Sequence, residues 1–172
     1  MKRRVVNKQF NSSRCVVCGD RNQFSLKTRF YDLDNGEVAA VFRTEDWHQS
    51  YPGRVHGGIL SAVLDETIGR AIWVTSPDTW AVTVELELKF RKPVPTDAEL
   101  KALGRVTRDA RRLFEGSGEI LLPDGTVAVE AKGKYFKMPV GEIASEKFLE
   151  SEWYRIEDEA EPDEIELGDP DG

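Results

Sequence analysis

The sequence has few of the side chains on which most metal-dependent and nucleophilic hydrolases rely. Its 172 residues include two histidines, two cysteines and two methionines. A Ser–His–Asp hydrolase would need one of the two histidines as its base, and the chain contains no Gly-x-Ser-x-Gly motif that would present the serine. Catalytic zinc sites usually draw on histidine as well, so the scarcity of histidine argues against both classes.

Long apolar runs are also missing. No stretch approaches the about 20 apolar residues that a membrane-spanning helix requires, so we expect no interaction with a membrane. The first residues, Met1–Lys8, are basic, but the apolar segment of a signal peptide does not follow them. We therefore expect a cytoplasmic protein. Hydrophobic residues make up 40% and charged residues 32% of the chain, as in an ordinary globular domain.

Charge is unevenly distributed along the chain. Of the 31 acidic residues, 13 lie in residues 141–172, where only 2 of the 24 basic residues are found. Residues 1–140 therefore carry an excess of four basic residues, although the net charge of the chain is −7. This mild positive charge suits a phosphate-bearing ligand. The sequence lacks the basic stripe with interleaved aromatics that would predict binding to nucleic acid. The acidic tail, residues 141–172, is predicted to be largely disordered apart from a short helix near Glu146–Tyr154.

The hydrophobic pattern predicts one domain in residues 25–140, preceded by an irregular lead-in, residues 1–24. From His56 to Ser76, apolar residues recur at spacings of three and four, which indicates one long helix. Period-two alternation and turn residues indicate strands on both sides of it, at residues 25–33, 38–42, 80–92, 99–107, 113–122 and 126–138. A single helix packed on a curved antiparallel sheet is an α+β fold.

Cys15 and Cys18 form a Cys-x-x-Cys-Gly motif in the lead-in. Such a pair followed by glycine resembles half of a zinc knuckle, but the chain has no second pair of ligands in the usual spacing. The motif is compatible with a metal site, with a redox pair, and with a local turn that buries two small thiols. We predict no metal at the catalytic site.

The most informative stretch begins with His56-Gly57-Gly58 and ends with Asp65-Glu66. Glycines at a helix start let another group approach the backbone closely. The first amides of a helix have no internal partner and favour negative charge, such as the oxyanion that forms when water attacks a thioester. At about 100° per residue, Asp65 falls opposite the apolar stripe and among small residues, which indicates a crevice or a contact with another chain.

This motif, a His-Gly-Gly with an acidic residue nine positions after the histidine, resembles the PaaI-type and 4-hydroxybenzoyl-CoA thioesterases of the hotdog superfamily. The run 52–59, Leu64-Asp65-Glu66 and the N-terminal Cys-x-x-Cys-Gly are similar to one subgroup, and the similarity covers residues 15–138. The resemblance implies a hotdog fold and hydrolysis of an acyl-CoA without a cofactor. It also implies a dimer, or a dimer of dimers, with active sites at the interface.

The same resemblance implies roles for individual residues. Asp65 would orient or deprotonate the attacking water, or attack the thioester itself. Either Gly57 or Gly58 would polarise the carbonyl through its amide, across the interface from Asp65, and His56 would lie near the carbonyl and the leaving sulfur. Thr83, eighteen residues after Asp65 and on the polar side of its strand, would help to hold the water.

Further residues are candidates for substrate binding. Some relatives carry an asparagine six residues before the motif histidine; here the position is Ser50, next to Gln49, and either side chain can donate a hydrogen bond. Arg91 and Lys92 end the long strand and are candidates for the CoA phosphates. Three tryptophans, Trp47, Trp73 and Trp80, are candidates to line the acyl pocket.

Two alternatives to a thioesterase stay open. A non-catalytic hotdog module that binds acyl-CoA would gain nothing from a desolvated carboxylate at Asp65. A hotdog dehydratase would use an Asp–His pair from a motif that the sequence does not contain. Glu66 points about 100° away from Asp65 on the helix, so we expect it in a salt bridge or an interface.

Overall fold

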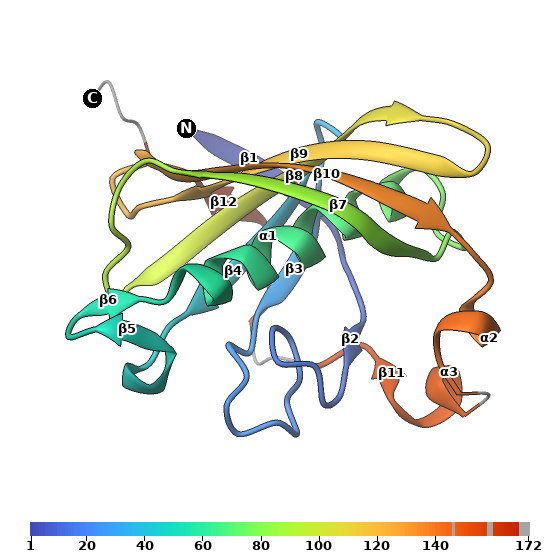
Figure 1. Cartoon of the computed structure of the whole chain (residues 1–172), viewed down its shortest axis with the longest axis horizontal. Coiled ribbons are helices and arrows are strands. Elements are labelled where there is room, and N and C mark those ends of the chain that lie inside the picture. Colours follow the sequence, from blue (N-terminus) through green and yellow to red (C-terminus); the bar gives the residue numbers. More distant parts are fainter. Residues whose placement is uncertain (146, 158–159, 169–172) are drawn as a thin grey trace.

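The computed structural model describes residues 1–145, 147–157 and 160–168. Within these residues, eight antiparallel strands form one sheet in the order β12-β1-β3-β4-β8-β9-β10-β7, and helix α1 (Gly57–Arg70) lies across one face of it (Figure 1). This arrangement confirms the predicted α+β fold. The strands of the sheet are β1 (Lys2–Lys8), β3 (Arg29–Leu33), β4 (Val38–Arg43), β7 (Ala81–Phe90), β8 (Glu99–Asp109), β9 (Leu113–Leu121), β10 (Val127–Lys137) and β12 (Glu164–Glu166).

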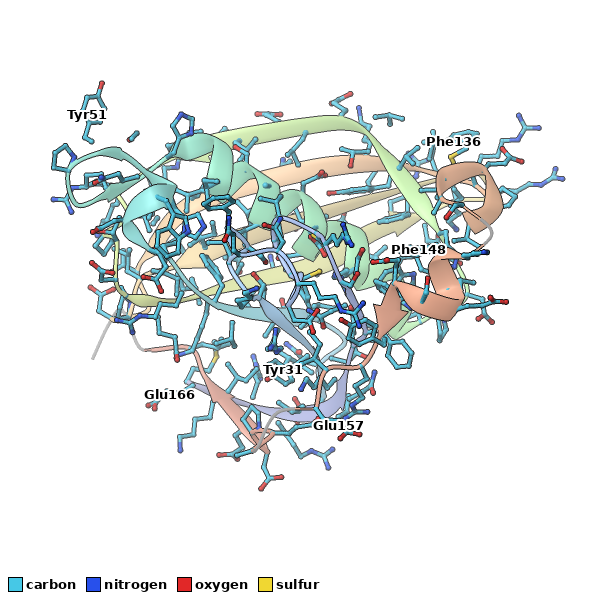
Figure 2. All side chains as sticks on the ribbon, turned by 90° about the horizontal axis from the view of Figure 1, so that it is seen from below. Tyr31, Tyr51, Phe136, Phe148, Glu157 and Glu166 are labelled. Carbon is cyan, nitrogen blue, oxygen red and sulfur yellow. The ribbon has the colours of Figure 1, made fainter. Side chains whose placement is uncertain are left out.

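Shorter elements surround this body. Strand β2 pairs with β11, and β5 pairs with β6 in a hairpin that leads into α1. Figure 2 shows Tyr51 at the outer end of that hairpin, pointing away from the body. Among the described residues, no helix is both long and apolar enough to span a membrane. The elements are β2 (Asn11–Ser12), η1 (Asp46–His48), β5 (Gln49–Tyr51), β6 (Arg54–Val55), η2 (Ala71–Val74), α2 (Val140–Ile143), α3 (Phe148–Ser151) and β11 (Trp153–Tyr154).

Helix α1 begins where the sequence predicts because its first turn is capped. His56 is the N-cap in an extended conformation, and its Nδ1 accepts the N–H of Gly58 at 2.8 Å. The predicted apolar stripe faces the sheet and forms the centre of the main core with residues of β4, β8, β9 and β10. Its buried members are Leu60, Val63, Leu64, Thr67 and Ile68.

Glycines in β8 and β9 bring α1 close to the sheet. A Cβ added to Gly104 would lie 2.6 Å from the carbonyl oxygen of Thr67, and one added to Gly116 would lie 2.5 Å from a methyl carbon of Ile68. Real Cβ atoms do not approach other atoms so closely, so only glycine fits beneath this part of the helix. The height of α1 above the sheet, and with it the position of Asp65, therefore depends on these two strands.

A β-bulge in β7 turns Thr83 toward α1. Strict alternation places Thr83 on the face opposite to Leu86, which packs against the main core. However, Lys134 of β10 pairs with Glu85 while the next residue, Tyr135, pairs with Thr83, so Val84 has no partner in the ladder. The extra residue reverses the alternation and re-aims the side chain. Thr83 thus reaches α1 through a bulge rather than from the polar face that the pattern predicted.

The predictions for the two ends of the chain were largely wrong. Strand β1 lies in the expected lead-in, and β12 pairs with it although residues 141–172 were expected to be disordered. The tail is held because Ile165 and Leu167 are buried on the face of the sheet opposite α1 and because the main chain of Leu167 donates to Met1. The predicted helix near Glu146–Tyr154 is reduced to α3, followed by β11. Residues 146, 158–159 and 169–172 lie outside the described residues.

Candidate active site

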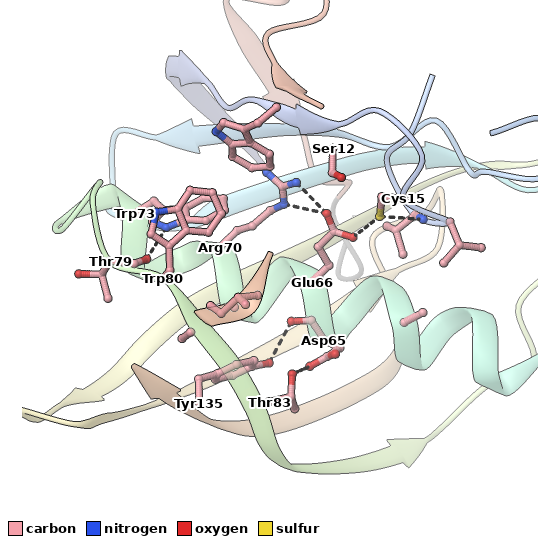
Figure 3. Close-up of a pocket in the computed structure, with 17 residues that line it drawn as sticks. Ser12, Cys15, Asp65, Glu66, Arg70, Trp73, Thr79, Trp80, Thr83 and Tyr135 are labelled. Atoms are coloured by element: carbon pink, nitrogen blue, oxygen red, sulfur yellow. Dashed lines mark hydrogen bonds and ion pairs between the residues drawn. The ribbon is translucent and has the colours of Figure 1, made fainter. Parts of the chain in front are cut away.

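One cavity of about 410 Å³ lies between α1, the start of β7 and the terminal segments (Figure 3). Asp65 and Thr83 line it together with Tyr135, and three tryptophans form its apolar end. The rings of these tryptophans meet edge-on, with each pair of centroids 5.2 Å apart. They are Trp73, Trp80 and Trp153.

Two hydroxyl groups hold Asp65 in this cavity. Thr83 donates its hydroxyl to Oδ1 of Asp65 at 2.7 Å, and Tyr135 donates to the main-chain carbonyl of Asp65 at 3.0 Å (Figure 3). Burial raises the pKa of the Asp65 carboxyl above its ordinary value, and the hydroxyl groups of Thr83 and Tyr135 act in the opposite direction. The arrangement leaves a partly desolvated carboxylate that can accept a proton from a water molecule.

A second group of predicted residues lies at the start of α1. Gly57, Arg91 and Lys92 line one cavity of about 320 Å³, next to the exposed ring of Phe90. Arg91 also forms an ion pair with Glu130 at 2.9 Å. Because the described residues offer no acceptor for the N–H of Gly57, this amide is available to a ligand.

His56 is exposed beside this second cavity and has a defined orientation. Its Nδ1 accepts the amide proton of Gly58, so the neutral imidazole carries its own proton on Nε2. That proton can be donated to a ligand. The same hydrogen bond occupies the Gly58 amide, which leaves Gly57 as the better candidate of the two glycines for polarising a carbonyl.

Two other predicted groups lie apart from both cavities. Gln49 and Ser50 are exposed on β5, and the side-chain oxygen of Gln49 accepts the N–H of Gly53 at 3.3 Å. Trp47 is 58% exposed and lies against the ring of His48, so its expected place in an acyl pocket is not supported. Only Trp73 and Trp80, of the three tryptophans considered from the sequence, line the cavity of Asp65.

Sequence reasoning missed Tyr135 and Trp153. Tyr135 is one of several alternating residues on β10, and only the pairing with Thr83 reveals its proximity to Asp65. Trp153 was assigned to the tail, yet β11 pairs with β2 and brings it against Trp73 and Trp80. A tryptophan in an otherwise acidic segment was the available signal, because tryptophan is highly buried on average.

The two groups of residues cannot act on one atom within a single chain. Asp65 lies eight residues after Gly57 on α1, which corresponds to about 12 Å along the helix axis. A water molecule held by Asp65 and a carbonyl bound by Gly57 would therefore be too far apart to react. The two groups of residues therefore lie about two helical turns apart on α1.

Known proteins with similar sequences include thioesterases, in agreement with the fold expected from the sequence. The family model for the thioesterase superfamily matches residues 52–129. MIOREX complex component 3 of Saccharomyces cerevisiae is 29% identical over 51% of this chain and 33% of its own length. The acyl-coenzyme A thioesterase THEM4 of Mus musculus is 24% identical over 63% of this chain and 46% of its own length. The matches thus span less than half of either curated relative.

Solved structures extend the comparison. The thioesterase superfamily protein RHA08564 superposes with a TM-score of 0.65 at 27% identity, over 72% of this chain and 60% of that chain. The smu.793 protein of Streptococcus mutans, bound to acetyl CoA, superposes with a TM-score of 0.56 at 21% identity, over 60% of this chain and 82% of that chain. The fold is therefore the hotdog fold. The family match over residues 52–129 confirms the resemblance to thioesterases stated from the sequence. The link of Cys-x-x-Cys-Gly to one subgroup stays a prediction.

Proposed function

We propose that this protein hydrolyses an acyl-CoA thioester to a free acid and CoA. The observation that carries the proposal is the hydrogen bond between Thr83 and Asp65 at the polar end of a cavity with tryptophan walls. An apolar acyl group fits such walls, and a carboxylate next to it serves as a base or nucleophile. The likeness to an acyl-coenzyme A thioesterase and to an acetyl CoA complex supports the same substrate class.

The proposed chemistry divides between Asp65, in the middle of α1, and the residues at the start of this helix. Asp65 takes a proton from water, which Thr83 helps to hold, and the water oxygen bonds to the thioester carbon. The Gly57 amide and the Nε2 proton of His56 stabilise the negative charge that develops on the carbonyl oxygen. The carbon–sulfur bond then breaks, and the leaving CoA thiolate receives the proton that Asp65 took from water, which restores the carboxylate. Arg91 and Lys92, beside Gly57, are placed to meet the phosphates of CoA.

This division requires a second copy of the chain. Strand β7 is the last strand of the sheet, and its Val84 and Phe90 are 58% and 54% exposed. A long edge strand with exposed apolar residues is a surface for strand pairing. In a two-fold dimer built across β7, the two α1 helices run antiparallel, so that Asp65 of one chain faces Gly57 of the other.

The direct test of the function is thiol release from a panel of acyl-CoAs. The panel should contain short, medium, long and aryl acyl groups. Asp65→Asn should lower the rate by at least ~10²-fold, whereas Asp34→Asn, on the exposed β3–β4 turn, should not change it. No turnover on any acyl-CoA would contradict the proposal, and tight binding without turnover would favour the non-catalytic binding module.

A complementation experiment tests the shared site. Gly57→Pro removes the amide proton at the first position of the helix, where proline is tolerated, and the extended backbone of His56 suits a residue before proline. Gly57→Ala is the control, because it keeps the amide and its Cβ would meet the Phe90 ring at an ordinary 3.4 Å.

Asp65→Asn and Gly57→Pro should each be inactive alone. When they are co-expressed, each mixed dimer contains one intact site, and random pairing restores about a quarter of the wild-type sites. Absence of any recovery in mixed dimers isolated with two different tags would show that the site is not shared between chains.

A further inference from the structure

A cluster of two thiols and one carboxylate lies beside the Asp65 cavity and takes no part in the proposed chemistry. The Sγ atoms of Cys15 and Cys18 and a carboxylate oxygen of Glu66 all lie within 4.8 Å of one another. Cys18 is completely buried, and Cys15 is partly buried. Bond lengths of about 2.3 Å to sulfur and 2.0 Å to oxygen place tetrahedral zinc ligands about 3.5 to 4 Å apart, so the three atoms already have suitable spacing.

From this cluster we propose that Cys15, Cys18 and Glu66 bind a Zn²⁺ ion that fastens the N-terminal segment to α1. Two cysteines separated by two residues supply neighbouring ligands from one turn, and α1 supplies the third. The proposal is independent of the proposed hydrolysis, because none of the three residues acts on the thioester.

The local backbone holds the sulfur of Cys15 in a defined place. The main-chain amides of Val17 and Cys18 donate to Sγ of Cys15 at 3.2 and 3.4 Å, which fixes the position of this sulfur in the turn. Gly19 allows the turn, since a Cβ at that position would lie 2.6 Å from the carbonyl oxygen of Cys15. The Cys-x-x-Cys-Gly motif thus folds as a compact turn with both sulfurs on the side that faces Glu66.

Glu66 completes the set from the helix. Its Oε1 accepts hydrogen bonds from Arg70 at 2.7 and 3.0 Å, while Oε2 lies 3.1 Å from Sγ of Cys15 (Figure 3). One oxygen is therefore held by the arginine, and the other is directed into the cluster. This division fixes the carboxylate in an orientation that suits a metal ligand.

Arg70 balances the charge of the proposed site. It is 3% exposed, stacks on Phe30 and donates to Sγ of Cys18 at 3.4 Å. Two thiolates, one carboxylate and Zn²⁺ carry a net charge of −1, which the buried guanidinium neutralises. It thus donates both to Sγ of Cys18 and to the Glu66 oxygen that faces away from the cluster, as outer-shell partners of a metal do.

The ligand types select the metal. Thiolates favour Zn²⁺ and other soft ions over Mg²⁺ and Ca²⁺, which prefer oxygen ligands. Three protein ligands leave one tetrahedral position, and a water molecule from the Asp65 cavity can fill it because Cys15 and Glu66 both line that cavity. Bound metal would hold one wall of the cavity in place through the turn that contains Val16 and Val17.

The test uses the full chain, reduced with a thiol-free phosphine, and the metals alone. Addition of Co²⁺ should give one bound ion per chain with sulfur-to-cobalt charge-transfer bands and tetrahedral d–d bands, and Zn²⁺ should displace it. Cys15→Ser and Glu66→Gln should each weaken Zn²⁺ binding by at least ~10-fold, since even outer-shell changes cost about 10–100-fold. Glu142→Gln, an exposed carboxylate on α2, should bind as the wild type does.

The spectrum of the wild-type protein decides the matter even if a variant fails to fold. A Co²⁺ spectrum without sulfur bands would overturn the proposal, because it would show binding to surface carboxylates only. Zn²⁺ affinity equal in wild type, Cys15→Ser and Glu66→Gln would overturn it as well. Far-ultraviolet circular dichroism of each variant separates loss of a ligand from loss of the fold.

Discussion

Replacement of Thr83 by valine isolates the hydrogen bond on which the proposed function depends. The two side chains have nearly the same shape, so the change removes the hydroxyl that donates to Asp65 at 2.7 Å and little else. A hydrogen bond to a charged group contributes about 1.5–3 kcal/mol. Because Thr83 is exposed and water can replace part of the bond, we expect the lower end of this range, a loss of about tenfold in kcat/KM.

The assay is thiol release with the best acyl-CoA of the panel, with Thr83→Ser as the control. Serine keeps the hydroxyl and should retain most of the activity. Thermal unfolding should be unchanged in both variants, since neither buries nor exposes apolar surface. Valine at the wild-type rate would refute the reasoning, because Asp65 would then need no donor from β7; equal losses in both variants would show that the shape of threonine matters rather than its hydroxyl.

Two further predictions concern stability. Gly104→Ala should destabilise the fold by about 1–3 kcal/mol, because its Cβ would meet the backbone of α1, and each kcal/mol should lower the Tm by about 2–4 °C. Gly141→Ala is the control and should leave the Tm unchanged, because its Cβ would have no atom within 4 Å. Equal effects of the two changes would contradict the close approach of helix and sheet. Ile165→Ala, at a side chain that is 3% exposed, should cost about 2 kcal/mol in denaturant unfolding, the lower end for such a truncation; an unchanged midpoint would show that β12 contributes little.

The central elements were predictable because their patterns are long. Helix α1 and strands β7 to β10 each extend over enough residues for a period of 3.6 or 2 to appear. Strand β1 was not predictable in the same way, since Lys2, Arg3 and Arg4 conceal its alternation. Strand β12 has only one apolar residue, Ile165, among its three residues. Its partner β1 is separated from it by almost the whole length of the chain. Such pairing depends on tertiary contacts that a local pattern does not contain.

In the candidate site, too, the sequence pattern predicts residues that are close in the chain but not contacts that depend on tertiary structure. The motif predicted Asp65, His56 and the glycines because all of them lie within one helix start and its first turns. The route by which Thr83 reaches Asp65 was not predicted, since it depends on the bulge at Val84 and therefore on the register between β7 and β10. The hydrogen bond that occupies Gly58 also depends on the rotamer of His56.

Adjacent carboxylates on α1 have separate partners, and this separation is compatible with both of the roles proposed for the helix. Asp65 faces Thr83 on β7, whereas Glu66, one residue later and about 100° around the helix, faces Arg70 and the thiol of Cys15. The two do not form a dyad that shares a proton, because each carboxylate is held by different donors. Asp65 thus lines the cavity. Glu66, on the same turn of α1, contacts Cys15 in the N-terminal segment, which forms part of the cavity wall. The position of the proposed catalytic carboxylate therefore depends on contacts at the neighbouring residue as well as on its own.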